Sequence, residues 1–354
     1  MIRQILTEIQ SQGIRLPDPS KARKDGAGPA EGGTLAIAGH GVTFPVAGQA
    51  MAHSPFSLEP GEPAMLLKNG QPVLEVQLLP RPLFYSQSSS DGVPLNQIAL
   101  LHGTDCLATT VRQECRHWNT PRQCLFCGIG LSLKNGGTIA RKTPEQLAQA
   151  ATAALCLDHV RHVVLTTGDF ADWREGLHAM AACTRAIKEA SALAVHVQVA
   201  PPPDPDALEI LQDAGVDTMG IHIESMDPDI LAKAAPAKAA LGQARYEASW
   251  KKAVKLFGPN QVSSFLLAGL GENPESLVEG ARVLAGMGVF PLPVPLRPIP
   301  GSKMADALPP SAESMARIYE PISRILAQNR LSSKSSKAGC VRCGACSALW
   351  AFEE

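Results

Sequence analysis

Short apolar runs alternate with helical segments over most of this chain. Each predicted helix start places an N-cap residue before a proline at the first helical position, at Thr143-Pro144, Asp204-Pro205, Asp227-Pro228 and Asn273-Pro274. Strands alternating with helices favour a parallel sheet with right-handed crossovers, here an α/β fold with a partial (β/α)6 barrel of the TIM type. The predicted strands are Gln97–Leu101, His162–Thr166, Ala194–Val199, Thr218–Ile223, Ser263–Ala268 and Phe290–Leu296.

The pattern changes on either side of this repeat. Residues 1–95 are rich in Gly and Pro and contain the alternating run Val73–Leu79, which predicts a short helix followed by a small β-rich module, an N-terminal α+β unit. Residues 96–330 would form the barrel. Residues 331–354 form a Cys-rich C-terminal tail, entered through the polar run Ser332–Lys337, for which we expect a flexible connection.

Composition narrows the function classes. The chain has 354 residues, 45% of them apolar, and a formal charge of −1, which is typical of a globular protein with a substantial core. No run of basic residues appears, so we expect no nucleic-acid partner and a small-molecule or carrier-bound substrate. The first residues interrupt any signal-peptide core, and no apolar stretch of about 18 residues occurs, which predicts a cytoplasmic protein without a membrane partner.

Six of the nine cysteines fall into two groups. In a reducing compartment they are expected to be thiols or metal ligands rather than disulfides. Cys115, Cys124 and Cys127 supply three ligands, one fewer than a closed zinc or iron–sulfur site requires, and an open iron is a place where a ligand can bind. This motif alone fits a cluster or a zinc site equally well. The cysteines come directly after the first predicted strand, Gln97–Leu101, on a loop of the kind where barrel enzymes carry their chemistry.

Polar or glycine-rich segments also follow later predicted strands. They include a Gly-Asp pair that would otherwise cap the next helix, and glycines that permit close backbone approach to a ligand. Arg245 lies about twenty residues beyond the fourth strand, and a solvated arginine is its simpler interpretation. The segments are Thr166-Thr167-Gly168-Asp169, Gly220–Ser225, Leu267–Glu272 and Pro298–Ser302.

In this order, the landmarks over residues 96–305 resemble those of the radical S-adenosylmethionine (SAM) superfamily. Its usual spacing is Cys-x3-Cys-x2-Cys, whereas the first gap here has eight residues. The resemblance implies that three cysteines hold a 4Fe-4S cluster whose fourth iron chelates SAM. It also implies these cofactor contacts: Phe126 and Gly128 beside the cluster, Thr167, Gly168 and Asp169 at the SAM amino group, Glu224 at the ribose, Arg245 at the carboxylate, and Gly269 and Leu270 behind the adenine.

The implied activity is reductive cleavage of SAM to a 5′-deoxyadenosyl radical, which abstracts hydrogen from the substrate, with a flavodoxin- or ferredoxin-type electron donor. The cofactor supplies the chemistry and the protein aims it. No residue is singled out as catalytic. A non-catalytic iron–sulfur or zinc scaffold, or an electron carrier, is the alternative of a different class.

The tail motif of Cys340, Cys343 and Cys346 has two overlapping Cys-x2-Cys steps, which resemble ferredoxin-type ligand runs and suggest an auxiliary iron–sulfur cluster of the 4Fe-4S type. A zinc knuckle completed by a distant residue, or an inert tail, are the alternatives. Its fourth ligand is open between Cys106, Cys183, a histidine and the substrate. Such a cluster would bind substrate or transfer electrons, or donate sulfur as in biotin and lipoyl synthases.

The extended cysteine loop, the N-terminal module and the tail together resemble the radical SAM proteins of nitrilase-containing bacterial gene clusters associated with cyanide assimilation, which are grouped with biotin synthase-related sequences. This resemblance implies no particular reaction.

Overall fold

The computed structural model describes residues 2–16, 32–46 and 53–353, which form two sheets. The smaller sheet has five antiparallel strands in the order β2-β1-β5-β4-β3. Helix α1 packs its buried face, including Leu6 and Ile9, against β2 and against the late helix α12. The elements of this part are α1 Ile2–Gln12, β1 Gly32–Ile37, β2 His40–Pro45, β3 Phe56–Glu59, β4 Ala64–Lys68 and β5 Gln71–Leu78.

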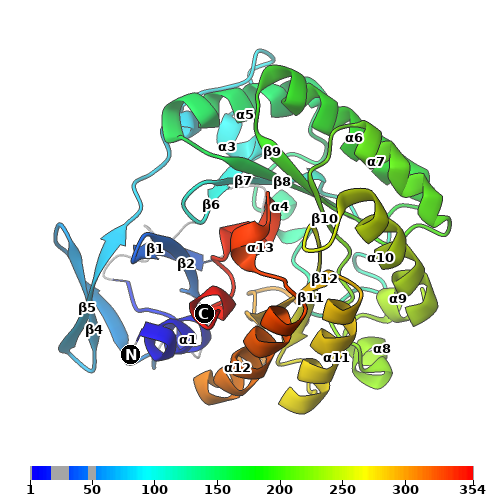
Figure 1. The fold of residues 1–354 in the computed structure, drawn as a ribbon. Helices are drawn as coiled ribbons and strands as arrows, with labels where there is room; N and C mark the ends of the chain where they lie inside the picture. The colour runs from blue at the N-terminus through cyan, green and yellow to red at the C-terminus, as the bar shows by residue number, and fades with distance from the viewer. Residues whose placement is uncertain (1, 17–31, 47–52, 354) are drawn as a thin grey trace.

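The larger sheet has seven strands in the order β12-β11-β10-β9-β8-β7-β6. All neighbours are parallel except β6 and β7, which form an antiparallel hairpin. Figure 1 shows this sheet curled into a partial barrel with helices along its outer side. The fold class expected from the sequence is therefore confirmed. The strands are β6 Leu100–His102, β7 Cys106–Arg112, β8 His162–Thr167, β9 Ala194–Gln198, β10 Thr218–Gly220, β11 Val262–Ala268 and β12 Val289–Pro295.

The outer helices complete the α/β repeat. Their apolar faces cover the outward side chains of the strands, such as Val163 and Leu165 of β8, which are fully buried. The helices that follow the strands are α5 Pro144–Asp158, α6 Trp173–Ala190, α7 Glu209–Asp213, α8 Pro228–Ala234, α9 Pro236–Ala239, α10 Gln243–Phe257, α11 Pro274–Gly286 and α12 Ala312–Gln328. The short helices are η2 Leu83–Ser86, α3 Leu95–Ile98, α4 Leu131–Lys134, η3 Pro205–Leu208, η4 Ser333–Ser335, α13 Gly339–Cys343 and η5 Leu349–Ala351.

The predicted helix starts are confirmed. Thr143 and Gln146 form a capping box, in which the threonine side chain accepts from the Gln146 amide at 3.2 Å and the Gln146 side chain accepts from the Thr143 amide at 3.0 Å. Asp204, Asp227 and Asn273 each accept a backbone N–H in the first turn of the helix that they precede. These caps work because the first N–H groups of a helix have no partner within it.

The first predicted strand is wrong. Residues 97 and 98 end helix α3, and only Leu100 and Leu101 belong to a strand, the antiparallel edge strand β6. The first parallel strand is β7, whose buried residues include Thr109 and Thr110 on opposite faces of the sheet. Hydroxyl side chains of this kind do not stand out in a search for apolar runs, although Thr110 bonds to Thr166 of β8 across the sheet at 3.1 Å.

The prediction of a flexible connection at Ser332–Lys337 is also wrong. Asn260 bonds to both backbone groups of Ser332, at 2.8 and 3.0 Å, and the Glu353 carboxylate accepts from the Ser332 hydroxyl and the Ser333 amide. Ser336 is buried. A polar sequence is therefore held in place here by hydrogen bonds, which a composition-based argument does not detect.

The tail packs between the two sheets. Helix α13 contacts β8, β9 and β10, and Figure 1 shows it inside the curl of the large sheet, close to β1 and β2. The Ala345 carbonyl accepts from the Thr43 amide at 2.9 Å and from the Gln10 side chain at 3.1 Å. Trp350 stacks on His40 with ring centroids 3.9 Å apart. The N-terminal sheet thus holds the tail against the barrel.

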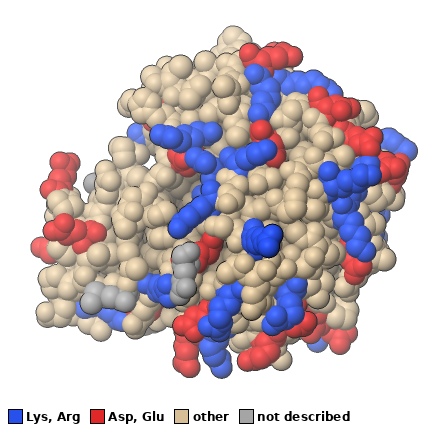
Figure 2. Space-filling view, in the orientation of Figure 1, with Lys and Arg blue, Asp and Glu red and all other residues tan. Residues whose placement is uncertain are grey.

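Charged side chains of both signs are interspersed over the outer helices on the face shown in Figure 2. Among the described residues, no helix is both long enough and apolar enough to cross a membrane.

Candidate active site at the carboxyl ends of the strands

The three-cysteine loop leaves the carboxyl end of β7 and crosses the end of the barrel. It is a series of turns, in which the Trp118 amide donates to the Cys115 carbonyl at 3.0 Å and the Cys127 amide to the Cys124 carbonyl at 3.1 Å. The Leu125 amide donates to the Ala234 carbonyl of α8 at 2.8 Å, which fixes the second half of the loop against the far side of the barrel.

Two glycines permit this path. A Cβ on Gly168, at the end of β8, would lie 1.8 Å from the Glu114 carbonyl oxygen and 3.0 Å from the Cys115 Cα. A Cβ on Gly130 would lie 2.3 Å from the Trp118 indole nitrogen. The loop therefore contacts the Gly168 backbone directly. Within the loop, the Trp118 side chain packs against Gly130, just after the last cysteine. Any larger residue at these two positions must displace the loop.

The three thiols lie close enough to influence one another. All are partly exposed and none is in a disulfide. Burial raises the pKa of Cys127 to about 12, and the charges of Cys124 and Cys115 add to the increase. Burial also raises the pKa of Cys124, with a further increase from Glu224 and Cys115 and an opposing effect of Lys238. Thiols with raised pKa values in one place become thiolates readily only when a cation binds them.

Asp169 joins the loop to the end of β8. Its Oδ2 accepts from Arg116 Nε at 2.9 Å and lies 2.8 Å from His117 Nε2, while its carbonyl accepts from the Arg116 amide at 2.9 Å. The carboxylate thus fixes the residue that follows Cys115.

A cavity of about 250 Å³ opens beside this part of the loop. Four of the predicted SAM contacts line it together, from the ends of β8 and from helix α10, and Arg116 lines it as well. The Arg245 guanidinium donates to the Pro201 carbonyl at 2.7 Å, which orients it along the cavity wall. The four predicted residues are Thr167, Gly168, Asp169 and Arg245.

Glu224 lies elsewhere. Its side chain is buried, its backbone has the positive φ of 75°, and its carboxylate pairs with Lys238 Nζ at 2.6 Å. Lys238 also donates to the His222 carbonyl at 2.6 Å. Burial is the largest single effect and lowers the pKa of Lys238, but the charges of Glu224, Tyr246 and Cys124 and the hydrogen bond to Glu224 together outweigh it, so the net change in pKa is upward.

The remaining predicted contacts form part of the surrounding loops. The Gly269 and Leu270 amides both donate to the Glu272 carboxylate, at 2.8 and 3.0 Å. The carboxylate of this turn therefore satisfies the two amides of the same turn. Phe126 is half-buried, and Gly128 packs against Ile299 of the loop after β12. None of these four residues lines the 250 Å³ cavity.

The tail cysteines form a second group inside the barrel. Charge effects among Cys340, Cys343 and Cys346 show that they lie together, and all three are partly exposed. Within residues 2–16, 32–46 and 53–353, no three His, Cys, Asp or Glu side chains converge as ligands of one metal ion. Thiolates that hold a cluster bind separate irons, so they stand further apart than the ligands of a single ion.

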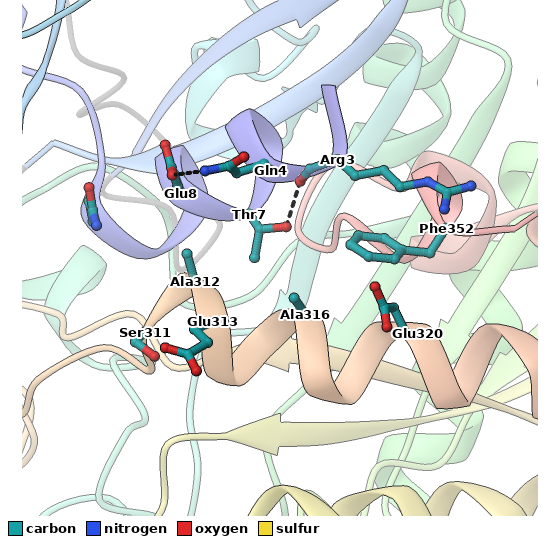
Figure 3. A pocket seen from close by; sticks show the side chains of 11 residues that line it. Arg3, Gln4, Thr7, Glu8, Ser311, Ala312, Glu313, Ala316, Glu320 and Phe352 are labelled. Carbon is teal, nitrogen blue, oxygen red and sulfur yellow. Dashed lines mark hydrogen bonds between the residues drawn. The ribbon is translucent and has the colours of Figure 1, made fainter. Parts of the chain in front are cut away.

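A larger cavity, of about 520 Å³, lies between α1 and α12 next to the tail residue Phe352 (Figure 3). Arg3, Glu8 and Glu320 are among its lining residues, and none of the predicted site residues lines it. Of the two cavities, only the smaller one is lined by residues that the sequence analysis singled out.

The sequence analysis did not predict two charged residues that lie near the site. Arg116 follows the first ligand directly, and this adjacency was the available signal. Lys238 has no signal in the sequence, because only the fold brings the segment after α8 next to Cys124 and Glu224.

Comparison with known proteins gives a family match. Residues 120–284 match the family model described as the Radical SAM superfamily. A curated relative, bacteriochlorophyllide c C-7(1)-hydroxylase of Chlorobaculum limnaeum, is 25% identical over 252 residues, covering 66% of this chain and 62% of the relative. The chain therefore spans less than two thirds of that protein's length.

Two solved structures are similar in outline. Methylornithine synthase gives a TM-score of 0.46 at 18% identity, covering 65% of this chain and 64% of that one. A radical SAM methyltransferase from Sphaerobacter thermophilus gives 0.47 at 14% identity, covering 81% and 76%.

Proposed function

We propose that this radical SAM protein is an enzyme that cleaves SAM reductively at a cluster held by Cys115, Cys124 and Cys127. The radical SAM assignment has the support of the family model over residues 120–284. Two observations carry the proposal: the three thiols lie close enough to influence one another, and Arg116, the residue after Cys115, lines the cavity together with Thr167, Gly168 and Arg245 at the carboxyl ends of the strands. This end of an α/β barrel is where the loops after the strands bring catalytic groups together.

The residues present fit such a cofactor pair. Three soft thiolates are the donor set of an iron–sulfur cluster, and with three ligands one iron keeps an open position. Gly168 leaves the loop the room that its path requires. When bound, the cluster would supply one electron to the SAM sulfonium, giving methionine and a 5′-deoxyadenosyl radical that takes a hydrogen atom from the substrate.

The chain's own residues would bind and orient SAM. Arg245 is a fixed cation on the cavity wall and suits the SAM carboxylate. Asp169 is an anion on the same wall and suits the ammonium group, while Arg116 and His117 hold it in position. Lys238 neutralises Glu224, which leaves this buried carboxylate able to accept further hydrogen bonds without an uncompensated charge.

The finer parts of the proposal concern partners and chemistry. The substrate is a small or carrier-bound molecule, the electron comes from a flavodoxin- or ferredoxin-type donor, and the tail cysteines hold an auxiliary cluster. Of the two roles for this cluster, we propose substrate binding or electron transfer rather than sulfur donation. We also propose that the protein belongs with the radical SAM proteins of nitrilase-containing gene clusters, which are grouped with biotin synthase-related sequences. This part of the proposal rests on the extended cysteine loop and the tail.

The test is anaerobic reconstitution with iron and sulfide, followed by measurement of 5′-deoxyadenosine formed from SAM with dithionite. We expect formation by the wild type and its loss in a Cys115→Ala, Cys124→Ala, Cys127→Ala triple variant. Cys156→Ala is the matched control, because Cys156 is an exposed free thiol on α5. A fully loaded wild type that forms no 5′-deoxyadenosine, or one that carries zinc at these cysteines, would contradict the proposal and favour a scaffold or carrier.

A further inference from the structure

Cys343 of the second cysteine group lies inside the barrel, beside the end of β7 opposite to the one from which the cysteine loop leaves. His102 ends β6 and Cys106 begins β7, and the two residues are paired across the hairpin. The cysteine loop leaves from the other end of β7, after Arg112. Six residue steps along a strand correspond to about 20 Å. The tail cysteines therefore mark a separate centre.

His102 is the side chain that links the tail sulfurs. Its Nδ1 lies 3.5 Å from the Cys343 sulfur and its Nε2 lies 3.5 Å from the Cys346 sulfur. Next to it, Gly103 lacks a side chain where a Cβ would lie 2.8 Å from the Cys343 sulfur. The turn between β6 and β7 is thus shaped so that the imidazole and the tail cysteine come together.

Nitrogen donors surround the other sulfurs. The Gln198 amide at the end of β9 donates to the Cys340 sulfur at 3.3 Å, and Arg297 Nη1 lies 4.0 Å from the Cys346 sulfur. Such N–H donors stabilise thiolates and tune a metal centre, whereas neutral thiols in a core need none. Two neighbours fix the backbone here: the Gly339 amide donates to His162 Nδ1 at 3.2 Å, and the Gly339 backbone lies against the His196 ring.

We propose that His102 is the fourth protein ligand of the tail centre, so that Cys340, Cys343, Cys346 and His102 hold a closed iron–sulfur cluster. This inference rests on the proposed auxiliary cluster but does not depend on SAM cleavage. Imidazole replaces thiolate in known iron–sulfur centres, where it raises the reduction potential. Four protein ligands leave no iron open, so of the two roles proposed above for this cluster, this inference selects electron transfer over substrate binding.

The two other cysteines are placed differently from His102. Cys106 bonds to Cys343, lies within range of the Cys340 charge and is 1% exposed at the start of β7, whereas His102 contacts the sulfurs of Cys343 and Cys346. Cys106 is therefore the competing ligand, and the Cys106→Ala variant below tests it. Cys183 lies on α6, where Glu145 of α5 is the neighbour that adds to the effect of burial in raising its pKa. It faces the outer helices and not the tail.

The test uses the full chain with the first cluster removed by Cys115→Ala, Cys124→Ala and Cys127→Ala. After anaerobic reconstitution, iron and sulfide are counted, and the reduced sample is examined by pulsed electron paramagnetic resonance for coupling to a histidine nitrogen. Isotope-labelled histidine identifies the signal. We expect one cluster per chain with a histidine coupling that is unaffected by the matched control Cys106→Ala.

Two substitutions of His102 separate ligation from folding. His102→Cys should retain the cluster, lose the nitrogen coupling and lower the reduction potential, while His102→Ala should lose the coupling and part of the iron. Three results would each overturn the proposal. They are a cluster without histidine coupling in the protein that retains His102, a coupling that survives in His102→Cys, and zinc without sulfide at the tail cysteines. If the protein that retains Cys115, Cys124 and Cys127 fails to cleave SAM while the variant still shows this coupling, only the proposed function is contradicted.

Discussion

At the scale of single residues, the site depends on charged side chains that are buried and therefore poorly solvated. Lys238 and Glu224 are joined at 2.6 Å beside Cys124, and neither charge would be stable there alone. Lys142 is a different case. It is 4% exposed and donates only to neutral acceptors, Thr138 Oγ1 at 2.7 Å and the Ile139 carbonyl at 2.9 Å, with Gln113 further away at 3.4 Å. Gln113 in turn donates to the Ile129 carbonyl of the cysteine loop at 3.0 Å.

Lys142 makes stability depend on pH. Burial lowers the pKa of Lys142 to about 7, whereas an unfolded chain gives lysine a pKa of about 10.4. Between these values the unfolded state binds more protons, so the free energy of unfolding rises as pH increases from 7 towards 10. Below pH 7 the lysine is protonated in both states, and the full cost of a buried cation is present.

We therefore expect the wild type to gain stability relative to Lys142→Met by up to about 1.4 kcal/mol per pH unit between pH 7.5 and 9.5. Urea unfolding of the apo protein at several pH values measures the difference. The exposed Lys134→Met is the control and should follow the wild type at every pH. Parallel pH profiles for the wild type and Lys142→Met would show that Lys142 keeps an ordinary pKa.

At the scale of elements, the position of the cysteine loop is set by the end of β8. The loop crosses Gly168 so closely that the space of a Cβ is occupied by the Glu114 carbonyl. The sequence identified Gly168 as a residue near SAM. Its contact with the loop that carries Cys115 is a packing requirement that the sequence does not express.

Gly168→Ala should move the loop by more than 1 Å and lower 5′-deoxyadenosine formation by about a hundredfold, with less iron bound at the first cluster. Overpacking should also cost about 1–3 kcal/mol of stability. The control is Gly286→Ala at the end of α11, where a Cβ meets nothing within 4 Å. Normal iron content and cleavage in Gly168→Ala would show that the loop does not require this close approach.

At the scale of the whole molecule, the two ends of the chain meet over the open side of the barrel. The Thr43 amide and the Gln10 side chain both donate to Ala345, and Arg297 of the barrel donates to the Thr43 carbonyl at 2.7 Å. The tail cysteines are therefore held by the N-terminal sheet on one side and by the barrel on the other. Asn260 fixes the segment that leads into the tail.

Asn260→Gly should loosen this segment, because it removes two hydrogen bonds while glycine accepts the positive φ of 70°. We expect trypsin to cut after the exposed Lys334 and Lys337 about tenfold faster than in the wild type. Asn69→Gly is a matched control, since Asn69 is exposed and has a φ of 52° in the N-terminal sheet. Equal cleavage rates for all three proteins would show that Asn260 does not hold the tail.

The sequence by itself determined the repeat of strands and helices, because helix caps and apolar periodicity are local signals. Thr143 and Asn273 begin their helices as predicted, and the partial barrel follows from the order of the elements. Two predictions from the sequence were wrong. The strand β7 was missed because its buried threonines interrupt the apolar pattern, and Ser332–Lys337 was expected to be flexible although long-range hydrogen bonds order this polar run.

Only the tertiary structure decided which distant residues share a site. It brought Arg245 to the cavity of Thr167 and Gly168, Lys238 to Glu224, and His102 to the tail cysteines. The physical reason is that ligand residues and buried ion pairs depend on distance in space, whereas the sequence records only separation along the chain. His102 and Cys343 are 241 residues apart, and the fold places their side chains in contact.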